Sequence, residues 1–116
     1  MTLRIGSVTL DNPVILAPMS GVTDLPFRRL AKRFGAGLVV SEMIASQALI
    51  HANRRTLRMS RGAEEMAPLS IQLAGCEPGV MAEAAKLARD RGAAIVDLNF
   101  GCPAKKVVND MAGSAL

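Results

Sequence analysis

The chain has 116 residues and a formal net charge of +4; half of the residues are hydrophobic, 21% are charged, and neither Trp nor Tyr occurs. This composition excludes a disordered tail, the length allows one small domain, and no apolar run reaches the roughly 18 residues of a membrane span. The two cysteines, Cys76 and Cys102, form neither a disulfide framework nor a zinc motif, so we expect a cytoplasmic protein without a metal.

The first third of the chain predicts a hairpin, a buried strand and a helix. Residues 2–10 alternate around a Gly-Ser pair, which is typical of a small hairpin. Residues 14–17 (VILA) form a short apolar run, which is typical of a strand buried on both faces. Thr23 is expected to cap the following helix, with Asp24 in its first turn. The apolar stripe of this helix is expected at Phe27, Leu30, Ala31 and Phe34.

The rest of the chain alternates between predicted helices and strands. Residues 44–60 are expected to be helical at least in part, and another helix is expected to begin at Pro78 and end at Gly92. Residues 111–116 are expected to begin a further helix. The predicted strands lie at 38–40, 68–74 and 94–98. This order of elements predicts a parallel sheet with right-handed crossovers.

Residues whose side chains could take part in binding or catalysis follow the predicted strands. Ligands of parallel α/β folds collect at the carboxyl ends of the strands. Cys102 stands there between a glycine and a proline, ahead of two lysines, where a free cysteine often fills space as a small apolar group. The residues expected at these ends are Pro18, Met19, Ser20, Ser41, Glu42, Gln72, Asn99 and Cys102.

Four segments carry a family resemblance: APMSGVTDLPFR, SEM, IQLAG and DLNFGCPAKKVVNDMAGSAL. They resemble the tRNA-dihydrouridine synthases, most closely the bacterial B-type branch, over essentially the whole chain from Val14. The resemblance implies an α/β fold class, a partial (β/α)8 TIM barrel with about four N-terminal βα units after a short N-terminal hairpin. Residues 1–116 would form the N-terminal half of an FMN-binding catalytic domain, without the rest of the barrel and the C-terminal RNA-binding domain.

The same resemblance implies a flavin-dependent oxidoreductase that reduces uridine in tRNA to 5,6-dihydrouridine, with NADPH as the reductant and FMN as the cofactor. Cys102 matches the proton donor of the family, which would protonate C5 of uracil while FMN delivers hydride to C6. Asn99 matches the asparagine that helps to hold the target uracil. Lys105 and Lys106 are expected to meet tRNA phosphates.

The resemblance also assigns a flavin pocket. Pro18, Met19 and Ser20 match the flavin-contacting loop of the family, and Gln72 matches the glutamine that hydrogen-bonds the flavin ring. From the residues alone, a strand-ending turn and a core hydrogen bond remain open for these positions. Glu42 could support the site or form a salt bridge with an arginine. Either tRNA or solvent could face Arg54, Arg55, Arg58 and Arg61.

Two other functions remain open. An FMN-dependent enzyme similar to dihydroorotate or dihydropyrimidine dehydrogenases would act on free pyrimidines, although the Ala104-Lys105-Lys106 sequence favours the tRNA enzyme. A non-catalytic RNA-binding half-barrel is the other alternative. Because the rest of the family's barrel would be missing, we expect the chain alone to bind FMN weakly, to have no useful activity, and to self-associate through its open sheet edges.

Overall fold

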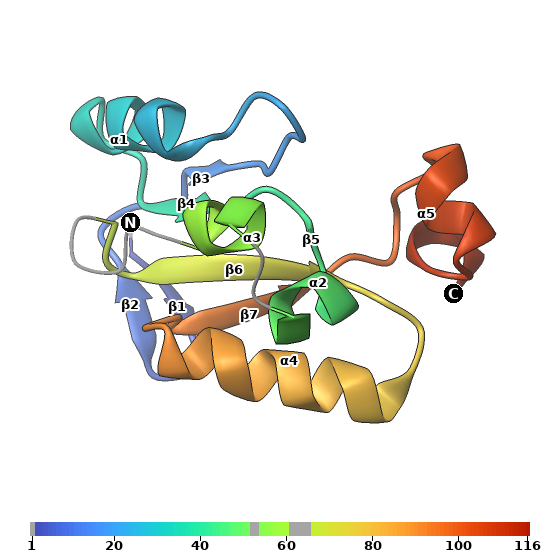
Figure 1. Ribbon diagram of the computed structural model, residues 1–116. Helices are drawn as coiled ribbons and strands as arrows, with labels where there is room; N and C mark the ends of the chain where they lie inside the picture. The colour runs from blue at the N-terminus through green and yellow to red at the C-terminus, as the bar shows by residue number, and fades with distance from the viewer. Residues whose placement is uncertain (1, 52–53, 61–65) are drawn as a thin grey trace.

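The structure, a computed structural model, describes residues 2–51, 54–60 and 66–116. A small antiparallel hairpin precedes a parallel sheet whose strands alternate with helices (Figure 1). The hairpin consists of β1 (Leu3–Ile5) and β2 (Val8–Leu10), and Gly6 takes a φ of 59° in the turn between them. Only glycine adopts that backbone conformation readily, so the predicted hairpin and its glycine are confirmed.

The parallel sheet is built around its longest strand, β6. Strands β4 and β5 pair with one edge of β6, β7 pairs with the other edge, and β3 pairs with β4. All of these pairs are parallel, as the alternation of elements predicted. The four predicted strands are confirmed to within a residue at each end, whereas β5 was not predicted. The burial expected for residues 14–17 is wrong, because Val14 and Ile15 are 60% and 42% exposed. The strands are β3 (Ile15–Leu16), β4 (Leu38–Val40), β5 (Ile44–Ala45), β6 (Leu69–Ala74) and β7 (Ile95–Leu98).

Among the described residues, five helices and one 3₁₀ turn connect or follow these strands: α1 (Leu25–Arg33), α2 (Ser46–His51), α3 (Arg54–Met59), α4 (Pro78–Asp90), α5 (Lys105–Asn109) and the turn η1 (Gly113–Ala115). Helix α4 begins at Pro78 as predicted, and Gly92 follows its last turn with a φ of 98°. Helix α5 was not predicted. The further helix expected over 111–116 is instead the short turn η1.

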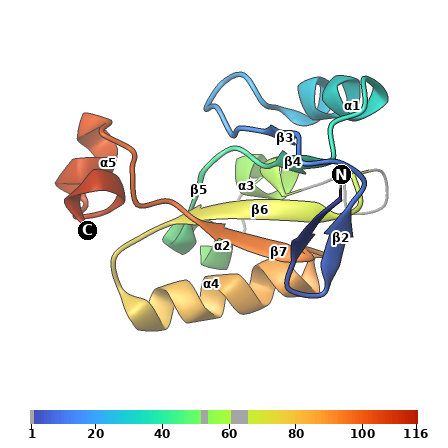
Figure 2. The same cartoon turned by 180° about the vertical axis from the view of Figure 1, so that it is seen from behind.

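The strands of the sheet present different residues to its two faces. Leu69, Ile71 and Leu73 of β6 are at most 1% exposed and pack with apolar residues of α2 and α4. A second apolar cluster forms around Leu10 of the hairpin and Leu38 of β4. It lies on the opposite face of the sheet, because successive side chains of a strand point to opposite faces. Helices α1 to α4 therefore contribute side chains to the apolar cluster on one face of the sheet, while the hairpin covers part of the other face (Figure 2).

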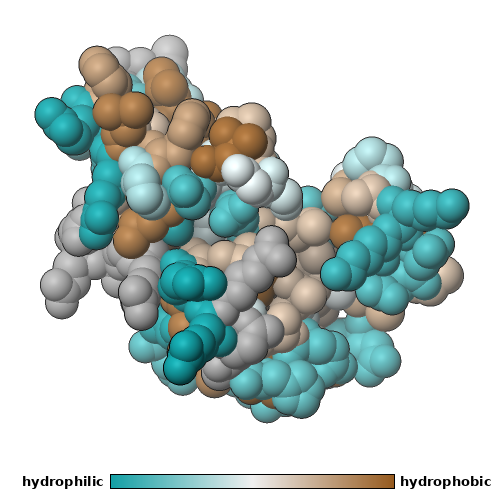
Figure 3. Space-filling model, turned by 45° about the horizontal axis from the view of Figure 1, so that its top comes forward, coloured by the Kyte–Doolittle hydropathy of each residue, from teal (hydrophilic) through white to brown (hydrophobic). Residues whose placement is uncertain are grey.

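The expected stripe of α1 is wrong. Phe27, Leu30 and Phe34 are 39%, 48% and 85% exposed, whereas Arg28 is buried at 1%. Of the expected stripe only Ala31 packs on the core, together with Leu25, which was not expected there. Figure 3 shows apolar side chains gathered on the surface over α1.

The expected cap of α1 is also wrong. Asp24 is the N-cap, and its side chain accepts a hydrogen bond from the Phe27 N–H at 3.0 Å. Thr23 is fully buried, and its hydroxyl oxygen instead accepts a hydrogen bond from the Met19 N–H at 3.0 Å. Both residue types are good helix caps, but Thr23 is engaged by the loop that precedes the helix.

Candidate active site

Three polar side chains from β6 and the end of β7 form a connected row. Gln72 Nε2 donates to Asp97 Oδ2 at 2.5 Å, and Asn99 Nδ2 donates to Gln72 Oε1 at 3.2 Å. Gln72 and Asp97 are register partners on neighbouring parallel strands, so both side chains point to the same face, opposite Ile71 and Leu73. Gln72 is 7% exposed, and its amide is satisfied within this row, as burial requires.

The row continues into the loop that carries Cys102. Asn99 Oδ1 accepts hydrogen bonds from the Gly101 N–H at 3.0 Å and from the Cys102 N–H at 2.9 Å. On the other side of the loop, the Ser114 N–H donates to the Cys102 carbonyl oxygen at 3.0 Å. Cys102 is half-buried, so the residue is not part of the enclosed core. We refer to Asp97, Gln72, Asn99 and the Cys102 N–H as the amide row.

Gly113 brings the end of the chain close to Cys102. Its φ is 61°, and a Cβ at this position would lie 2.5 Å from the Cys102 carbonyl oxygen and 3.2 Å from the Cys102 Cβ. The same Cβ would lie 2.8 Å from a methyl group of Val107. A side chain is therefore excluded here, and the residues after Cys102 fold back against it.

The loop after β3 is held by two buried side chains. The Gly21 N–H donates to Glu42 Oε1 at 2.6 Å, and the Met19 N–H donates to the Thr23 hydroxyl oxygen at 3.0 Å. Of the predicted flavin-contacting residues, Pro18 is half-buried, while Met19 and Ser20 are exposed. Glu42 thus holds this loop, while its support of a catalytic site stays a prediction.

Glu42 also acts electrostatically on a buried arginine. Burial lowers the pKa of the Arg28 guanidinium below its ordinary value, and the carboxylates of Glu42 and Asp24 oppose that shift because they favour the charged form. One Arg28 nitrogen donates to the Met59 carbonyl oxygen at 3.2 Å. The Glu42 carboxylate therefore accepts a hydrogen bond from the loop and also favours the charged form of the buried Arg28.

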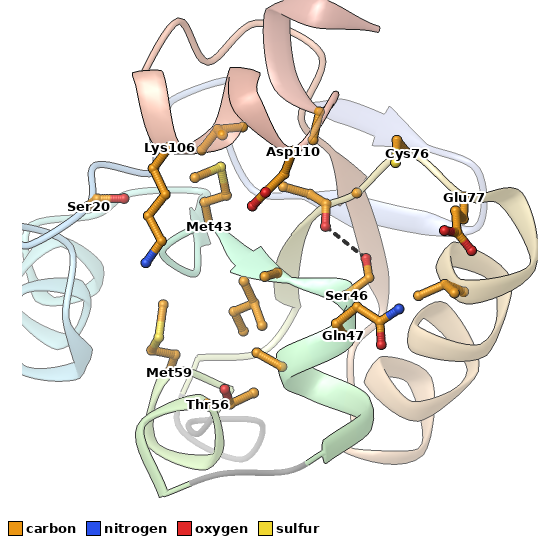
Figure 4. A pocket seen from close by; sticks show the side chains of 18 residues that line it. Ser20, Met43, Ser46, Gln47, Thr56, Met59, Cys76, Glu77, Lys106 and Asp110 are labelled. Carbon is orange, nitrogen blue, oxygen red and sulfur yellow. Dashed lines mark hydrogen bonds between the residues drawn. The ribbon is translucent and has the colours of Figure 1, made fainter.

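A cavity of about 650 Å³ opens at the carboxyl ends of the strands. Ser20 follows β3, Ala74 ends β6, and Lys106 and Asp110 reach the cavity from α5 and its last turn. Figure 4 shows these α5 side chains across the cavity from Thr56 and Met59 of α3. Val107, which contacts the Gly113–Cys102 region, also lines it, so the cavity lies beside the cysteine loop.

The structure brings the sequence-predicted residues together in two groups. Gln72, Asn99 and Cys102 belong to the amide row, while Ser20 and Lys106 line the cavity. Lys105 is exposed on the first turn of α5, outside the cavity lining. The catalytic and binding roles of all these residues stay predictions. Arg54 and Arg58 are exposed, the Arg55 side chain is not described, and Arg61 lies outside the described residues.

Three residues that contact the candidate site or its loops were not among the predicted site residues: Asp97, Thr23 and Gly113. Asp97 carried a weak signal, a carboxylate in an otherwise apolar strand, whereas no sequence pattern marks the contact of Gly113 with Cys102. Within residues 2–51, 54–60 and 66–116, no three His, Cys, Asp or Glu side chains lie close enough to hold a metal ion. No helix in that part of the chain is long and apolar enough to cross a membrane.

Known proteins match this chain along almost its whole length. The profile of the dihydrouridine synthase family matches residues 15–116. A probable tRNA-dihydrouridine synthase of Rickettsia bellii is 63% identical over 115 residues, which are 98% of this chain and 35% of that protein. For the tRNA-dihydrouridine synthase B of Pseudomonas aeruginosa the identity is 53%, over 98% of this chain and 34% of that protein. The chain thus spans about a third of the length of these curated relatives, and it belongs to the dihydrouridine synthase family.

Proposed function

We propose that this chain contributes part of the active site of an enzyme that reduces uridine in tRNA to 5,6-dihydrouridine. The names of the relatives support tRNA and dihydrouridine as substrate and product. The observation that carries the proposal is the position of Cys102, half-buried in a loop that Asn99 holds at the carboxyl ends of parallel strands. A thiol in that position is accessible to a pyrimidine ring and can act as a general acid.

The amide row fits a ring that presents carbonyl oxygens. The Gln72 and Asn99 amide nitrogens each carry two N–H groups, and each uses one of them within the row. The second N–H of each can donate to a carbonyl oxygen of a flavin or a uracil. Gln72 and the backbone of residues 18–20 would hold FMN, whose reduced form, regenerated with NADPH, would supply hydride to the uracil ring.

The residues of this chain would then complete the reduction. Asn99 would orient the uracil, and Cys102 would transfer its thiol proton to C5 of the base. Lys105 and Lys106 are exposed beside the cysteine loop and suit contacts with tRNA phosphates. The target base must leave its stack to reach such a site. We place this reaction in the cytoplasm, on the evidence of two unpaired cysteines.

A barrel is the architecture that we propose for the complete domain. All helices in contact with the main apolar cluster pack on one face of the parallel sheet, as they do on the outside of a (β/α)8 barrel. The amide row lies on the opposite face. Because the relatives are about three times as long as this chain, we expect the 116 residues alone to bind FMN weakly and to have no useful activity.

A chimera tests the proposal directly. The 116 residues replace the matching third of the Rickettsia bellii relative, and reduction of an unmodified tRNA transcript is measured with NADPH. Cys102→Ala is expected to slow dihydrouridine formation at least about 100-fold, the usual size of general acid catalysis. Oxidation of NADPH by the bound flavin, measured without tRNA, should be unchanged and serves as the internal control.

The same chimera separates the alternatives. Reduction of free uracil or dihydroorotate in preference to tRNA would favour the free-pyrimidine enzyme. Salt-dependent tRNA binding without flavin, unaffected by Cys102→Ala, would favour the RNA-binding half-barrel. Uridine reduction that survives Cys102→Ala unchanged would refute the assignment of Cys102 as proton donor.

A further inference from the structure

We propose that Asp97 is a positioning residue that fixes the Gln72 and Asn99 amides and, through them, the backbone of Cys102. This proposal takes one assumption from the proposed function, namely that the Cys102 thiol is the proton donor. Asp97 itself lies two hydrogen-bonded side chains away from the cysteine loop. It would act on the thiol by holding the loop, without touching substrate.

The polarity of the amide row carries this inference. An ionised carboxylate offers acceptors only, so Gln72 must turn its NH₂ group toward Asp97. The Gln72 oxygen is then left to accept from Asn99, which must turn its own NH₂ group toward Gln72. The Asn99 oxygen consequently faces the opposite way and accepts the N–H groups of Gly101 and Cys102. Acceptor and donor alternate without conflict from the carboxylate to the loop.

Without the carboxylate, the orientations of the Gln72 and Asn99 amides would no longer be fixed. A side-chain amide has nearly the same shape in its two flipped orientations, so packing alone does not choose between them. Without an acceptor at position 97, Gln72 could present its NH₂ group to Asn99. Two NH₂ groups would then face each other, and Asn99 would have to move or flip, which removes the acceptor from the Cys102 N–H. The low exposure of Gln72, 7%, leaves little water to compensate.

Hydrogen exchange of the loop amides measures this coupling without any need for activity. In the 116-residue chain, Asp97→Ala should raise the exchange rates of the Gly101 and Cys102 amides about tenfold, the effect of one lost hydrogen bond of ordinary strength. The Ser114 N–H, which binds the other side of the loop at the Cys102 carbonyl, is the reference and should change little. Asp97→Asn should raise the loop rates less than about threefold, because the Asn oxygen can accept the same hydrogen bond.

Two further variants make the test specific. Gln72→Met cuts the row in its middle and leaves Asp97 in place, so it should reproduce the effect of Asp97→Ala even if the latter variant folds poorly. Asp90→Ala removes a carboxylate that is 62% exposed on α4 and should change neither loop amide. Unchanged loop exchange in both row-cutting variants would overturn the proposal. An equal rise at Ser114 would also overturn it, since that result indicates general loosening.

The outcome is independent of the enzymatic proposal. Loop exchange that responds to Asp97 in the chain, together with a chimera that does not reduce uridine, would refute the function and leave the positioning role standing. Conversely, a chimera that needs Cys102 but whose loop exchange ignores Asp97 would refute the positioning role alone.

Discussion

Glu42 should contribute to stability through its charge as well as through its hydrogen bond. The side chain is 9% exposed, and its Oε1 accepts the Gly21 N–H at 2.6 Å. The carboxylate is also the stronger of two charges that favour the cationic form of Arg28, which is 1% exposed. Removing this charge leaves the buried guanidinium with less compensation, and that cost is largest where water is excluded.

The expected cost follows from these two contributions. Gly21 is exposed, so water can partly replace the lost acceptor, and we assign about 1 kcal/mol to that hydrogen bond. Breaking a buried pair by removing one partner typically costs about 3–5 kcal/mol, and Asp24 retains part of the compensation here, so we assign about 2 kcal/mol to the charge. Glu42→Ala should therefore lower the free energy of unfolding by about 3 kcal/mol. Glu42→Gln, which keeps an oxygen for the Gly21 N–H, should lower it by about 2 kcal/mol.

A double-mutant cycle isolates the charge contribution. In an Arg28→Met background no guanidinium remains to be compensated, so Glu42→Gln should cost less than about 0.5 kcal/mol there. The coupling between the two positions should thus be about 1.5 kcal/mol. Unfolding in urea is followed by far-ultraviolet circular dichroism, because the chain has no Trp or Tyr to report by fluorescence. Glu83→Gln, an exposed change on α4, is the matched control and should stay within about 0.5 kcal/mol.

The cycle can refute this reasoning in two ways. A coupling energy below about 0.5 kcal/mol would mean that the Glu42 charge does not stabilise Arg28. Equal losses for Glu42→Gln and Glu42→Ala would mean that the oxygen bound to Gly21 contributes nothing measurable.

Two other changes should separate close backbone contacts from exposed apolar surface. Gly37→Ala places a Cβ against the Asn12 carbonyl oxygen and should lower the free energy of unfolding by about 1–3 kcal/mol. Gly79→Ala is the control and should not lower it, because no atom lies within 4 Å of the added Cβ. Similar urea midpoints for the two variants would contradict this prediction. Phe34→Ser removes a ring that is 85% exposed, so it should reduce self-association in sedimentation velocity while the free energy of unfolding changes by less than about 0.5 kcal/mol; unchanged association would contradict it.

The strands of this chain were predictable because they are short, mainly apolar segments bounded by Gly, Pro or polar residues, although β6 and β7 also carry Ser70, Gln72 and Asp97. Such runs fit a sheet that is covered on both faces. Residues 38–40, for example, are all buried, and the structure confirms that strand without change. Helix α4 was predictable for a similar reason, since Pro78 and Gly92 mark its ends and two of its alanines, Ala84 and Ala88, are buried on one face.

Helix α1 shows where periodicity fails. Its apolar residues do recur at helical spacing, but the helix turns Arg28 inward and leaves Phe34 outside. A buried arginine is rare, and here it depends on the Glu42 charge and the Met59 carbonyl, which come from distant parts of the sequence. Helix α5 was missed because KKVVN is short and contains two β-branched residues.

The candidate site was predictable as a set of residues but not as a connected structure. The family resemblance pointed to Gln72, Asn99 and Cys102, and all three do belong to one hydrogen-bonded row. Asp97 completes the row only because β6 and β7 pair in one particular register, 25 residues apart in the chain. No local pattern in the sequence encodes that register.

The register of β6 and β7 links the core to the site. It pairs Ile71 with Val96 on the face that packs against the helices, and it pairs Gln72 with Asp97 on the opposite face. A slip of one residue would turn Asp97 toward the apolar cluster and Val96 toward Gln72, because side chains alternate along a strand. The free energy that the apolar cluster gains by burial thus disfavours this slip and favours the register in which the amide row forms. Packing on the far side of the sheet therefore contributes to the geometry at Cys102.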